Sequence, residues 1–258
     1  MLRLPLPEAG FRPHRDDDLD VPPIPLSQQD WDTAAEYRWF IGHYATICLW
    51  HLLLETLNGL ADEPAPAPGL VDRAATMYDA YSILLLYCGS CTPGVYAKSV
   101  RPRMIAADPA FSGRWARDYE PIPPMLRSVR RIHRPDLLAP LQQAVKTNLM
   151  VHMAVARHLV PGGESLLRES GHDPSASPTT IQQDIFDKFF HIERVSLCRR
   201  ELDTQFTNAL EQIHRDLMSR PLEIPCSWPG LPTSQADTIT RFHRDSTTLL
   251  SSLEGVPA

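Results

Sequence analysis

The stretch Phe40–Leu57, FIGHYATICLWHLLLETL, decides the fold of this 258-residue chain. It is almost wholly apolar, and its residues recur at the three- and four-residue spacing of an α-helix, which advances about 100° per residue. The stretch predicts a long buried helix over about Asp30–Leu60. A histidine, His43, stands inside it. The residues that share its helical face are Ile47, Trp50 and Leu54.

Helical spacing predicts four further helices along the chain. Their expected ranges are about Leu70–Cys88, Pro135–Leu159, Thr179–Arg220 and a shorter Thr238–Leu253. The long helix near the end begins with Thr180 and Gln183, which have the spacing of a capping box. Its apolar stripe starts at Ile181. No stretch alternates apolar and polar residues for long, so we expect no extended strands. The fold class is therefore all-α.

Proline is the outlier of the composition, at 25 of 258 residues, against a usual share of about 5%. The prolines fall between the expected helices, in Ala61–Gly69 and Pro221–Pro232, and in an acidic stretch over Arg15–Pro25. We therefore expect a single-domain helical bundle with long proline-rich connections. Residues 1–29 would form a proline-rich arm, and residues 30–258 would form the helical domain.

Several classes of protein are disfavoured by composition. The net charge of -6 argues against a nucleic-acid binder, which would show a basic face. No apolar run approaches the roughly 18 to 20 residues of a membrane span. The start of the chain lacks the apolar core of a secretory signal. Five cysteines, an odd number, do not suggest a disulfide framework. We expect a cytoplasmic protein that binds neither nucleic acid nor membrane.

Two more histidines, His152 and His191, lie on apolar faces of expected helices. The face of His152 carries Leu141, Val145, Ala156 and Leu159, and that of His191 carries Val195, Cys198 and Leu202. Three inward imidazoles suggest an internal site, and we favour a heme between helices. A heme iron takes a neutral imidazole as axial ligand, and oxidative heme chemistry uses a second polar group to move protons. A lone histidine on such a face is more often a core residue bonded to a carbonyl, so spacing leaves both roles open.

The pair Cys88–Cys91, in the sequence CGSC, has no setting that favours chemistry. A thioredoxin-type motif needs a βαβ unit, a zinc site needs a second ligand pair, and covalent heme attachment needs a histidine where Thr92 stands. We predict a tight turn after a helix, with Gly89 as its C-cap.

The segment Phe111–Ile122, FSGRWARDYEPI, combines an arginine with aromatic and hydroxyl side chains. Arg117 can donate two parallel hydrogen bonds to a carboxylate, and neighbouring aromatics can wall a pocket for a flat substrate. A surface loop with an Arg–Asp pair is equally compatible with the pattern. The surrounding arginines, which can also meet heme propionates or surface acids, are Arg101, Arg103, Arg114, Arg127, Arg130, Arg131 and Arg134.

Three segments carry a family resemblance. Phe40–Trp50 resembles the early helix of the tryptophan 2,3-dioxygenases, Phe111–Ile122 resembles their Ser-Gly loop, and Phe189–Val195 resembles their axial-histidine helix. Their order resembles the heme-dependent aromatic oxygenase superfamily. Cys88–Met104, followed by Pro109–Tyr119, is most similar to the bacterial heme-dependent L-tyrosine 3-hydroxylases of antibiotic biosynthesis.

The resemblance implies a role for each candidate residue. His191 would be the axial ligand of the heme iron, and His43 would be the distal acid/base. Arg117 would bind the substrate carboxylate. The residues near it would be Ser112 and Tyr119. His152 is a candidate second ligand, because some relatives with a tyrosine-derived substrate use two histidines.

The resemblance also implies a cofactor and a reaction. Relatives that attach heme covalently carry a cysteine four residues after the axial histidine, where this chain has Val195, so we expect non-covalent heme b. The expected reaction is hydroxylation of L-tyrosine ortho to the phenol, giving L-DOPA. The oxidant is hydrogen peroxide or dioxygen, and the resemblance favours peroxide. Alternatives are a tryptophan or indole oxygenase on the same scaffold and a non-enzymatic helical binding protein. A homodimer reached through the arm is also open.

Overall fold

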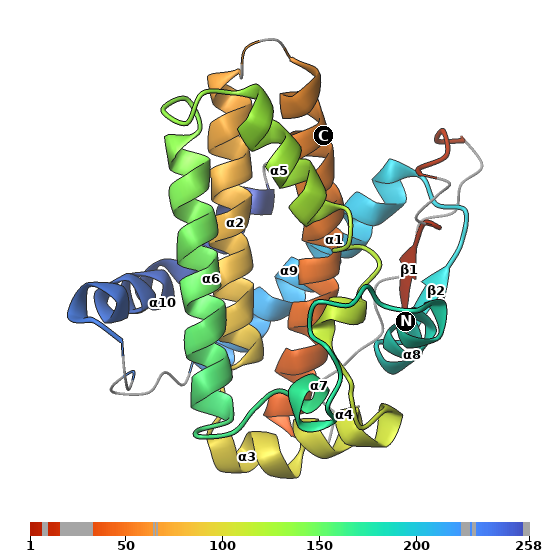
Figure 1. The fold of residues 1–258 in the computed structure, drawn as a ribbon, viewed down its shortest axis with the longest axis vertical. Helices are drawn as coiled ribbons and strands as arrows, with labels where there is room; N and C mark the ends of the chain where they lie inside the picture. The colour runs from red at the N-terminus through yellow and green to blue at the C-terminus, as the bar shows by residue number, and fades with distance from the viewer. Residues whose placement is uncertain are drawn as a thin grey trace.

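The computed structural model describes residues 1–6, 10–15, 33–63, 65, 67–222, 228 and 231–254. Within these residues the chain is mainly helical, which confirms the all-α prediction (Figure 1). Most of the expected arm over residues 1–29 lies outside the described residues, as does most of Pro221–Pro232. None of the described helices is long and apolar enough to cross a membrane.

Three long helices form the centre of the bundle: α1 (Ala34–Asp62), α2 (Pro68–Cys88) and α6 (Ala139–Leu159). They run side by side, with α2 packed against both α1 and α6 (Figure 1). Each matches a predicted helix to within a few residues. α1 begins at a capping box, in which the Thr33 hydroxyl accepts from the Glu36 N–H and the Glu36 carboxylate accepts from the Thr33 N–H.

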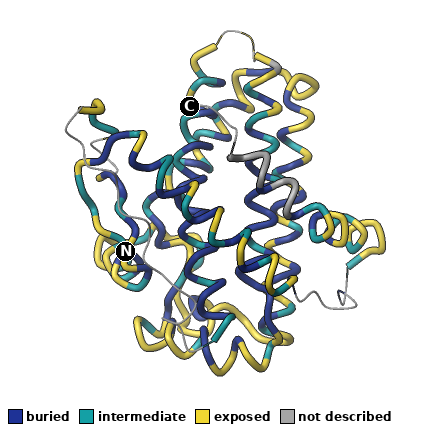
Figure 2. Tube along the Cα trace, turned by 180° about the vertical axis from the view of Figure 1, so that it is seen from behind, coloured by how far each residue is buried: buried dark blue, intermediate teal, exposed yellow. Residues whose placement is uncertain are grey.

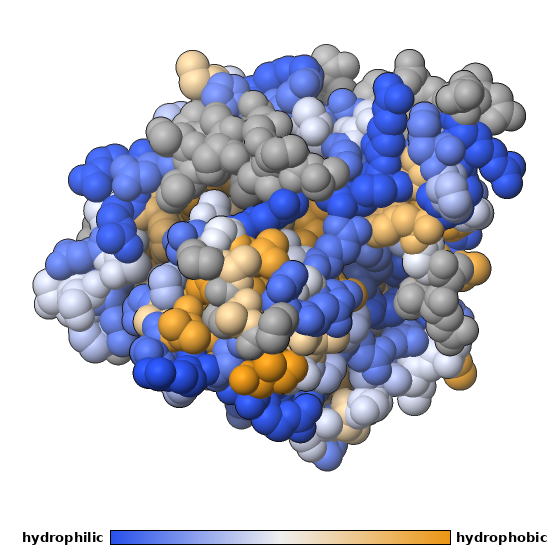
Figure 3. All heavy atoms as spheres, turned by 90° about the horizontal axis from the view of Figure 1, so that it is seen from above, coloured by the Kyte–Doolittle hydropathy of each residue, from blue (hydrophilic) through white to orange (hydrophobic). Residues whose placement is uncertain are grey.

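The remaining helices cover this centre. α5 (Ile122–Ile132) and α9 (Arg199–Ser219) pack on α1, and α10 (Thr233–Glu254) packs on α2. Buried residues line the inner sides of the long helices, and exposed residues lie on the periphery (Figure 2). From above, the surface is mostly hydrophilic, with apolar residues gathered near the centre of the view (Figure 3). Short helices that the sequence analysis did not anticipate are α3 (Pro93–Lys98), α4 (Val100–Ala107), α5 and α7 (Leu166–Glu169).

Two glycines bring the three central helices unusually close. A Cβ atom on Gly42 of α1 would lie 2.4 Å from the Cys88 sulfur, and one on Gly89 would lie 2.4 Å from a methyl group of Val155 on α6. Any larger side chain would force the helices apart at these points. Gly89 also caps α2, donating its N–H to the Leu85 carbonyl, as predicted for the CGSC turn.

The predicted helix over Thr179–Arg220 is wrong as a single element. The chain instead forms α8 (Thr180–Phe189), a turn, the strand β2 (Ile192–Arg194) and then α9. The first residues of the chain form a second strand, β1 (Leu2–Leu4), which pairs with β2 in parallel. Leu2 and Leu4 are fully buried by this pairing. Since the competing partner lies about 190 residues away, no local pattern could reveal the break.

Two details of α8 also differ from expectation. The capping box is formed by Thr179 and Gln182, one residue before the predicted pair, because Thr179 has the extended backbone of an N-cap. Ile181, which we placed on the buried stripe, is 72% exposed. The helix therefore turns only its later residues toward the core, among them Phe186 and Phe190.

Candidate functional site

His43 lies on α1 and is held in a defined tautomer. Its Nδ1 atom lies 2.6 Å from the Trp39 carbonyl oxygen, which can only accept a hydrogen bond, so Nδ1 carries the proton and Nε2 is left as the basic nitrogen. The ring stacks against Phe190 with a centroid distance of 4.7 Å. Burial lowers the pKa of His43 to about 4, helped by the nearby charge of His152 and opposed by the bond to Trp39. At neutral pH this imidazole is a proton acceptor.

The thiol of Cys88 completes the surroundings of His43. Its sulfur lies 3.5 Å from Nδ1, and the side chain is buried. Burial raises the pKa of this thiol well above its ordinary value, so it stays protonated. Cys88 therefore acts on His43 as a neutral packing and hydrogen-bonding group.

His152 lies on a face of α6 that is apolar yet uncovered. The side chain is exposed, and on the same side Leu149 and Met153 are 62% and 44% exposed. Leu149 and Met153 therefore present apolar surface to solvent beside His152. The surrounding protein nevertheless lowers the pKa of His152 by desolvation. Within the described residues, its ring has no hydrogen-bond partner.

His191 occupies the turn between α8 and β2. Its backbone has φ of +50°, in the left-handed region that residues other than glycine adopt at an energetic cost. The ring stacks on Phe40, one turn before His43 on α1, at 5.9 Å. Burial, the chain's N-terminal charge and Arg103 together lower the pKa of His191. Like His152, it is exposed and makes no side-chain hydrogen bond within the described part of the chain.

The expectation of three inward histidines is therefore correct only in part. His43 is half-buried, whereas His152 and His191 are exposed. The predicted helical face of His191 does not exist, because that segment is a turn and a strand. His43 still links the other two. Beyond the effect of burial, the electrostatic interaction with His152 lowers the pKa of His43. Phe40, one turn before His43 on α1, contacts the ring of His191.

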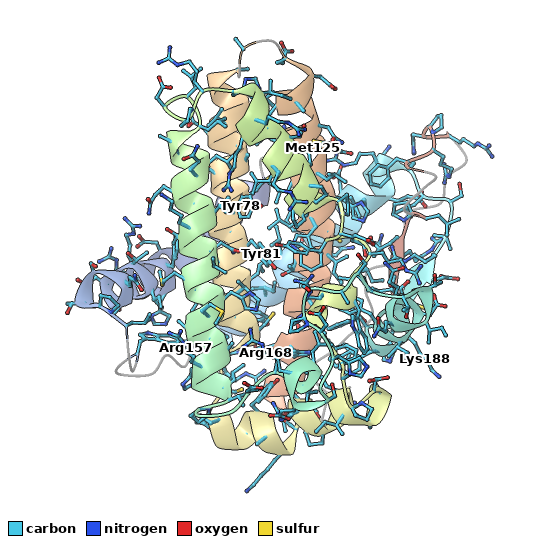
Figure 4. All side chains as sticks on the ribbon, in the orientation of Figure 1. Tyr78, Tyr81, Met125, Arg157, Arg168 and Lys188 are labelled. Carbon is cyan, nitrogen blue, oxygen red and sulfur yellow. The ribbon has the colours of Figure 1, made fainter. Side chains whose placement is uncertain are left out.

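The segment Phe111–Ile122 crosses in front of α1 and contributes aromatic contacts. Ser112 caps the short 3-10 helix η2 (Gly113–Trp115), accepting from the Arg114 N–H, and this cap accounts for the hydroxyl. The Tyr119 ring lies 5.1 Å from Trp50 of α1. Figure 4 shows Tyr78 and Tyr81 on α2 between α6 and α1, below Met125. Tyr81 meets Trp50 edge to face at 5.7 Å, so an aromatic group lies two turns along α1 from His43.

Arg117 is not free to meet a ligand without rearrangement. Its Nε donates to Asp187 at 2.9 Å, and its Nη2 donates to Asp184. Asp187 is mostly buried, whereas the Asp184 side chain is 66% exposed. A substrate carboxylate could replace Asp184 at Nη2 while Asp187 keeps its place. The structure thus brings together His43, His152 and the neighbourhood of His191, and it joins Arg117 to a separate ion-pair network.

Arg194, which no sequence pattern singled out, is the centre of this network. The guanidinium donates two hydrogen bonds to Asp187, at 2.9 and 2.6 Å, and two to Asp118, both at 2.8 Å. His51 adds a further contact to Asp118 at 2.9 Å. Arg194 stands three residues after His191, which is a local signal. Its partner Asp118 lies 76 residues earlier, and only the tertiary fold reveals that pairing.

The candidate histidines are spread over three elements and form no protein-only metal centre in the described part of the chain. Within the described residues, no group of three or more His, Cys, Asp or Glu side chains converges on one point. A porphyrin supplies the in-plane ligands itself and needs only one or two axial imidazoles. The pKa values of His152 and His191 are lowered, and within the described residues neither ring makes a hydrogen bond. His152 lies beside the exposed Leu149 and Met153. Cavities of about 60 Å³ beside η2 and about 240 Å³ between α2, α6 and α10 are not lined by these histidines.

Comparison with known protein families gives a match over the first part of the chain. A sequence model of the family described as SfmD 3-methyl-L-tyrosine peroxygenase matches residues 5–148. This range includes His43, Ser112, Arg117 and Tyr119 and ends before His152 and His191. A search of curated proteins finds no match. The wider dioxygenase-like superfamily therefore stays a prediction.

Proposed function

The chain belongs to the SfmD 3-methyl-L-tyrosine peroxygenase family, and from this premise we propose that it hydroxylates the ring of a tyrosine-like amino acid with hydrogen peroxide. The family match over more than half of the chain is the observation that carries the proposal. It favours an enzyme over a helical binding protein, and peroxide over dioxygen. It also favours 3-methyl-L-tyrosine over the unsubstituted L-tyrosine that the sequence resemblance implies. The hydroxyl would enter ortho to the phenol.

The cofactor in this proposal is heme b, which when bound supplies the activated oxygen for ring hydroxylation. His191 would bind its iron, with His152 as the second candidate ligand. Both imidazoles have lowered pKa values, and a neutral ring nitrogen is what iron binds. The uncovered apolar face around Leu149 and Met153 suits the flat, apolar edge of a porphyrin.

His43 has the properties of the group that moves the peroxide proton. Nδ1 donates to the Trp39 carbonyl, so the basic Nε2 accepts the proton and later returns it to the departing oxygen. A conjugate-acid pKa of about 4 makes return of the proton easy and its capture weak. Nε2 of His43 therefore takes a proton from hydrogen peroxide effectively only if the transfer is coupled to activation of the peroxide.

Substrate orientation falls to the segment after α4. Arg117 binds the amino-acid carboxylate at Nη2 after Asp184 swings away, and its Nε bond to Asp187 keeps the guanidinium in place. Tyr119 is only partly buried and packs on the buried Trp50, so its ring offers an aromatic surface against which a phenol ring can pack. Holding both ends of the substrate determines which ring carbon meets the oxidant, and positioning of this kind contributes much of an enzyme's rate and selectivity.

Product mass tests the proposal. Heme-loaded protein is incubated with 3-methyl-L-tyrosine and ¹⁸O-labelled hydrogen peroxide, and in parallel with dioxygen alone. The proposal predicts one added oxygen atom, derived from peroxide, and no product from dioxygen alone. Tyramine, which lacks the carboxylate, serves as a control and should react poorly. Product formed without peroxide, or addition of two oxygen atoms, would contradict the proposal.

A further inference from the structure

The turn that carries His191 is closed by an ion pair across its two sides. Asp187 lies four residues before His191, in the last turn of α8, and Arg194 lies three residues after it, at the end of β2. The guanidinium and the carboxylate form two hydrogen bonds, Nε to Oδ2 at 2.9 Å and Nη2 to Oδ1 at 2.6 Å. A forked pair of this kind fixes the relative direction of its two partners as well as their distance.

The turn is also anchored to the interior. Asp118 is 4% exposed and accepts from both Nη atoms of Arg194 at 2.8 Å, and from Nε2 of His51 on α1 at 2.9 Å. Burial alone would raise the pKa of Asp118, but the hydrogen bonds from Arg194 and His51 outweigh it and hold the pKa well below its usual range. The carboxylate is therefore charged and forms a fixed point between the turn and α1.

The backbone of His191 needs such support. A φ of +50° is unfavourable for a residue with a side chain and persists only where surrounding contacts impose it. The carbonyl of His191 accepts from the Leu2 N–H at 3.1 Å, and its N–H donates to the Lys188 carbonyl at 3.2 Å. The main chain is thus held by β1 on one side and α8 on the other, while the ring makes no hydrogen bond within the described residues.

We propose that Arg194 and Asp187 are positioning residues for His191, with Asp118 as their buried anchor. The inference rests on the proposed role of His191 as an iron ligand. Metal-binding histidines depend on surrounding groups that fix the ring, and loss of such groups commonly weakens metal affinity about 10- to 100-fold. In this chain the support acts through the backbone turn, because the imidazole stacks on Phe40 but makes no side-chain hydrogen bond within the described residues.

Arg194→Lys tests this inference. Lysine keeps the positive charge beside Asp118 but cannot form the forked bonds to two carboxylates, so the fold is retained while the turn is loosened. Two quantities are measured: amide hydrogen exchange over residues 188–194 in heme-free protein, and heme affinity by absorbance titration. We expect exchange in the turn to accelerate at least about tenfold and heme affinity to fall about tenfold or more. The rest of the protein should exchange as before.

The matched control is Arg199→Lys. Arg199 is the first residue of α9 and pairs with Glu55 and Asp203, so this variant makes the same substitution at an ion pair outside the turn. It should change neither hydrogen exchange in the turn nor heme affinity. The inference is overturned if Arg194→Lys leaves exchange in the turn unchanged, or if the turn loosens while heme affinity stays the same. Failure of the proposed function gives a different result. If His191→Ala binds heme as tightly as the wild type, His191 is not an iron ligand, whatever the turn does.

Discussion

The sulfur of Cys88 lies 3.5 Å from Nδ1 of His43, and the absence of a side chain at position 42 makes this approach possible. At Gly42, one residue before His43, α1 closely approaches Cys88 at the end of α2. The carbonyl oxygen of Trp39, one helical turn earlier on α1, accepts a hydrogen bond from Nδ1 of His43 at 2.6 Å. Backbone packing and the tautomer of the histidine are therefore set by one local arrangement.

Gly42→Ala should destabilise the protein by about 1–3 kcal/mol, because the added methyl group would meet the Cys88 sulfur at 2.4 Å and overpack the core. Gly59→Ala is the control on the same helix. Its nearest atom would be 3.5 Å away, so it should stabilise the helix by up to about 1 kcal/mol. Urea unfolding of both variants measures the difference. If both variants changed the free energy of unfolding in the same direction, the close approach of Gly42 to Cys88 would be contradicted.

Heme-free protein should lose stability as the pH falls from about 6.5 to 4. The unfolded pKa of histidine is about 6.5, and burial lowers that of His43 to about 4. Between these values the unfolded state binds more protons, so stability is present above the window and lost as pH falls through it. At pH 4.5 the loss relative to neutral pH is about 2.5 kcal/mol. His43→Gln should remove that part of the pH dependence of the free energy of urea unfolding. The same pH dependence in the variant and the wild type would contradict the lowered pKa of His43.

Asp184→Asn should tighten binding of 3-methyl-L-tyrosine, since the exposed carboxylate competes with substrate for Nη2 of Arg117. The Asp184 side chain is 66% exposed and that of Arg117 is 17% exposed. Solvent around the carboxylate limits the pair to about 1 kcal/mol, so the gain should not exceed about fivefold. Arg117→Gln should weaken binding. Calorimetric titration of heme-loaded protein measures both, with Asp203→Asn as a control on another exposed ion pair. Unchanged affinity in both variants would remove Arg117 from the substrate site.

Asp216→Ala should cost about 3–5 kcal/mol, because it leaves the buried guanidinium of Arg38 without its countercharge. The two groups lie 2.7 Å apart, and their side chains are 0% and 4% exposed. Glu211→Ala, on the outer side of the same helix, breaks only an exposed pair with Arg215 and should stay within about 0.5 kcal/mol. Denaturant unfolding compares them, and similar losses would contradict the burial of the pair.

Local pattern was sufficient for the long helices. Phe40–Leu57 and the spacing over Leu70–Cys88 and Pro135–Leu159 predicted α1, α2 and α6, because a buried helix imposes its period on its own sequence. The local pattern was insufficient where a segment distant in sequence determines the local structure by pairing with it. The apolar residues after Phe189 suit a helix equally well, and only pairing with Leu2–Leu4 makes them a strand.

The same reasoning separates the site residues. His43 and His152 could be found from their places on apolar helix faces, although the exposure of His152 could not. Arg117 was predicted to bind a substrate carboxylate, which stays a prediction. Its partners in the structure, Asp184 and Asp187, lie 67 and 70 residues away and could not be foreseen from the local pattern. Arg194 was missed, because its role depends on closing a turn that the sequence presents as continuous helix.

The central claim is that this chain binds heme and places a tyrosine-like amino acid beside it. The most direct measurement is an absorption spectrum of protein expressed with a heme precursor, recorded during titration with 3-methyl-L-tyrosine. The account predicts a Soret band that shifts with the amino acid and does not shift with tyramine at the same concentration. Absence of a Soret band in folded protein would contradict the claim, and a band indifferent to the amino acid would contradict the placement of the substrate.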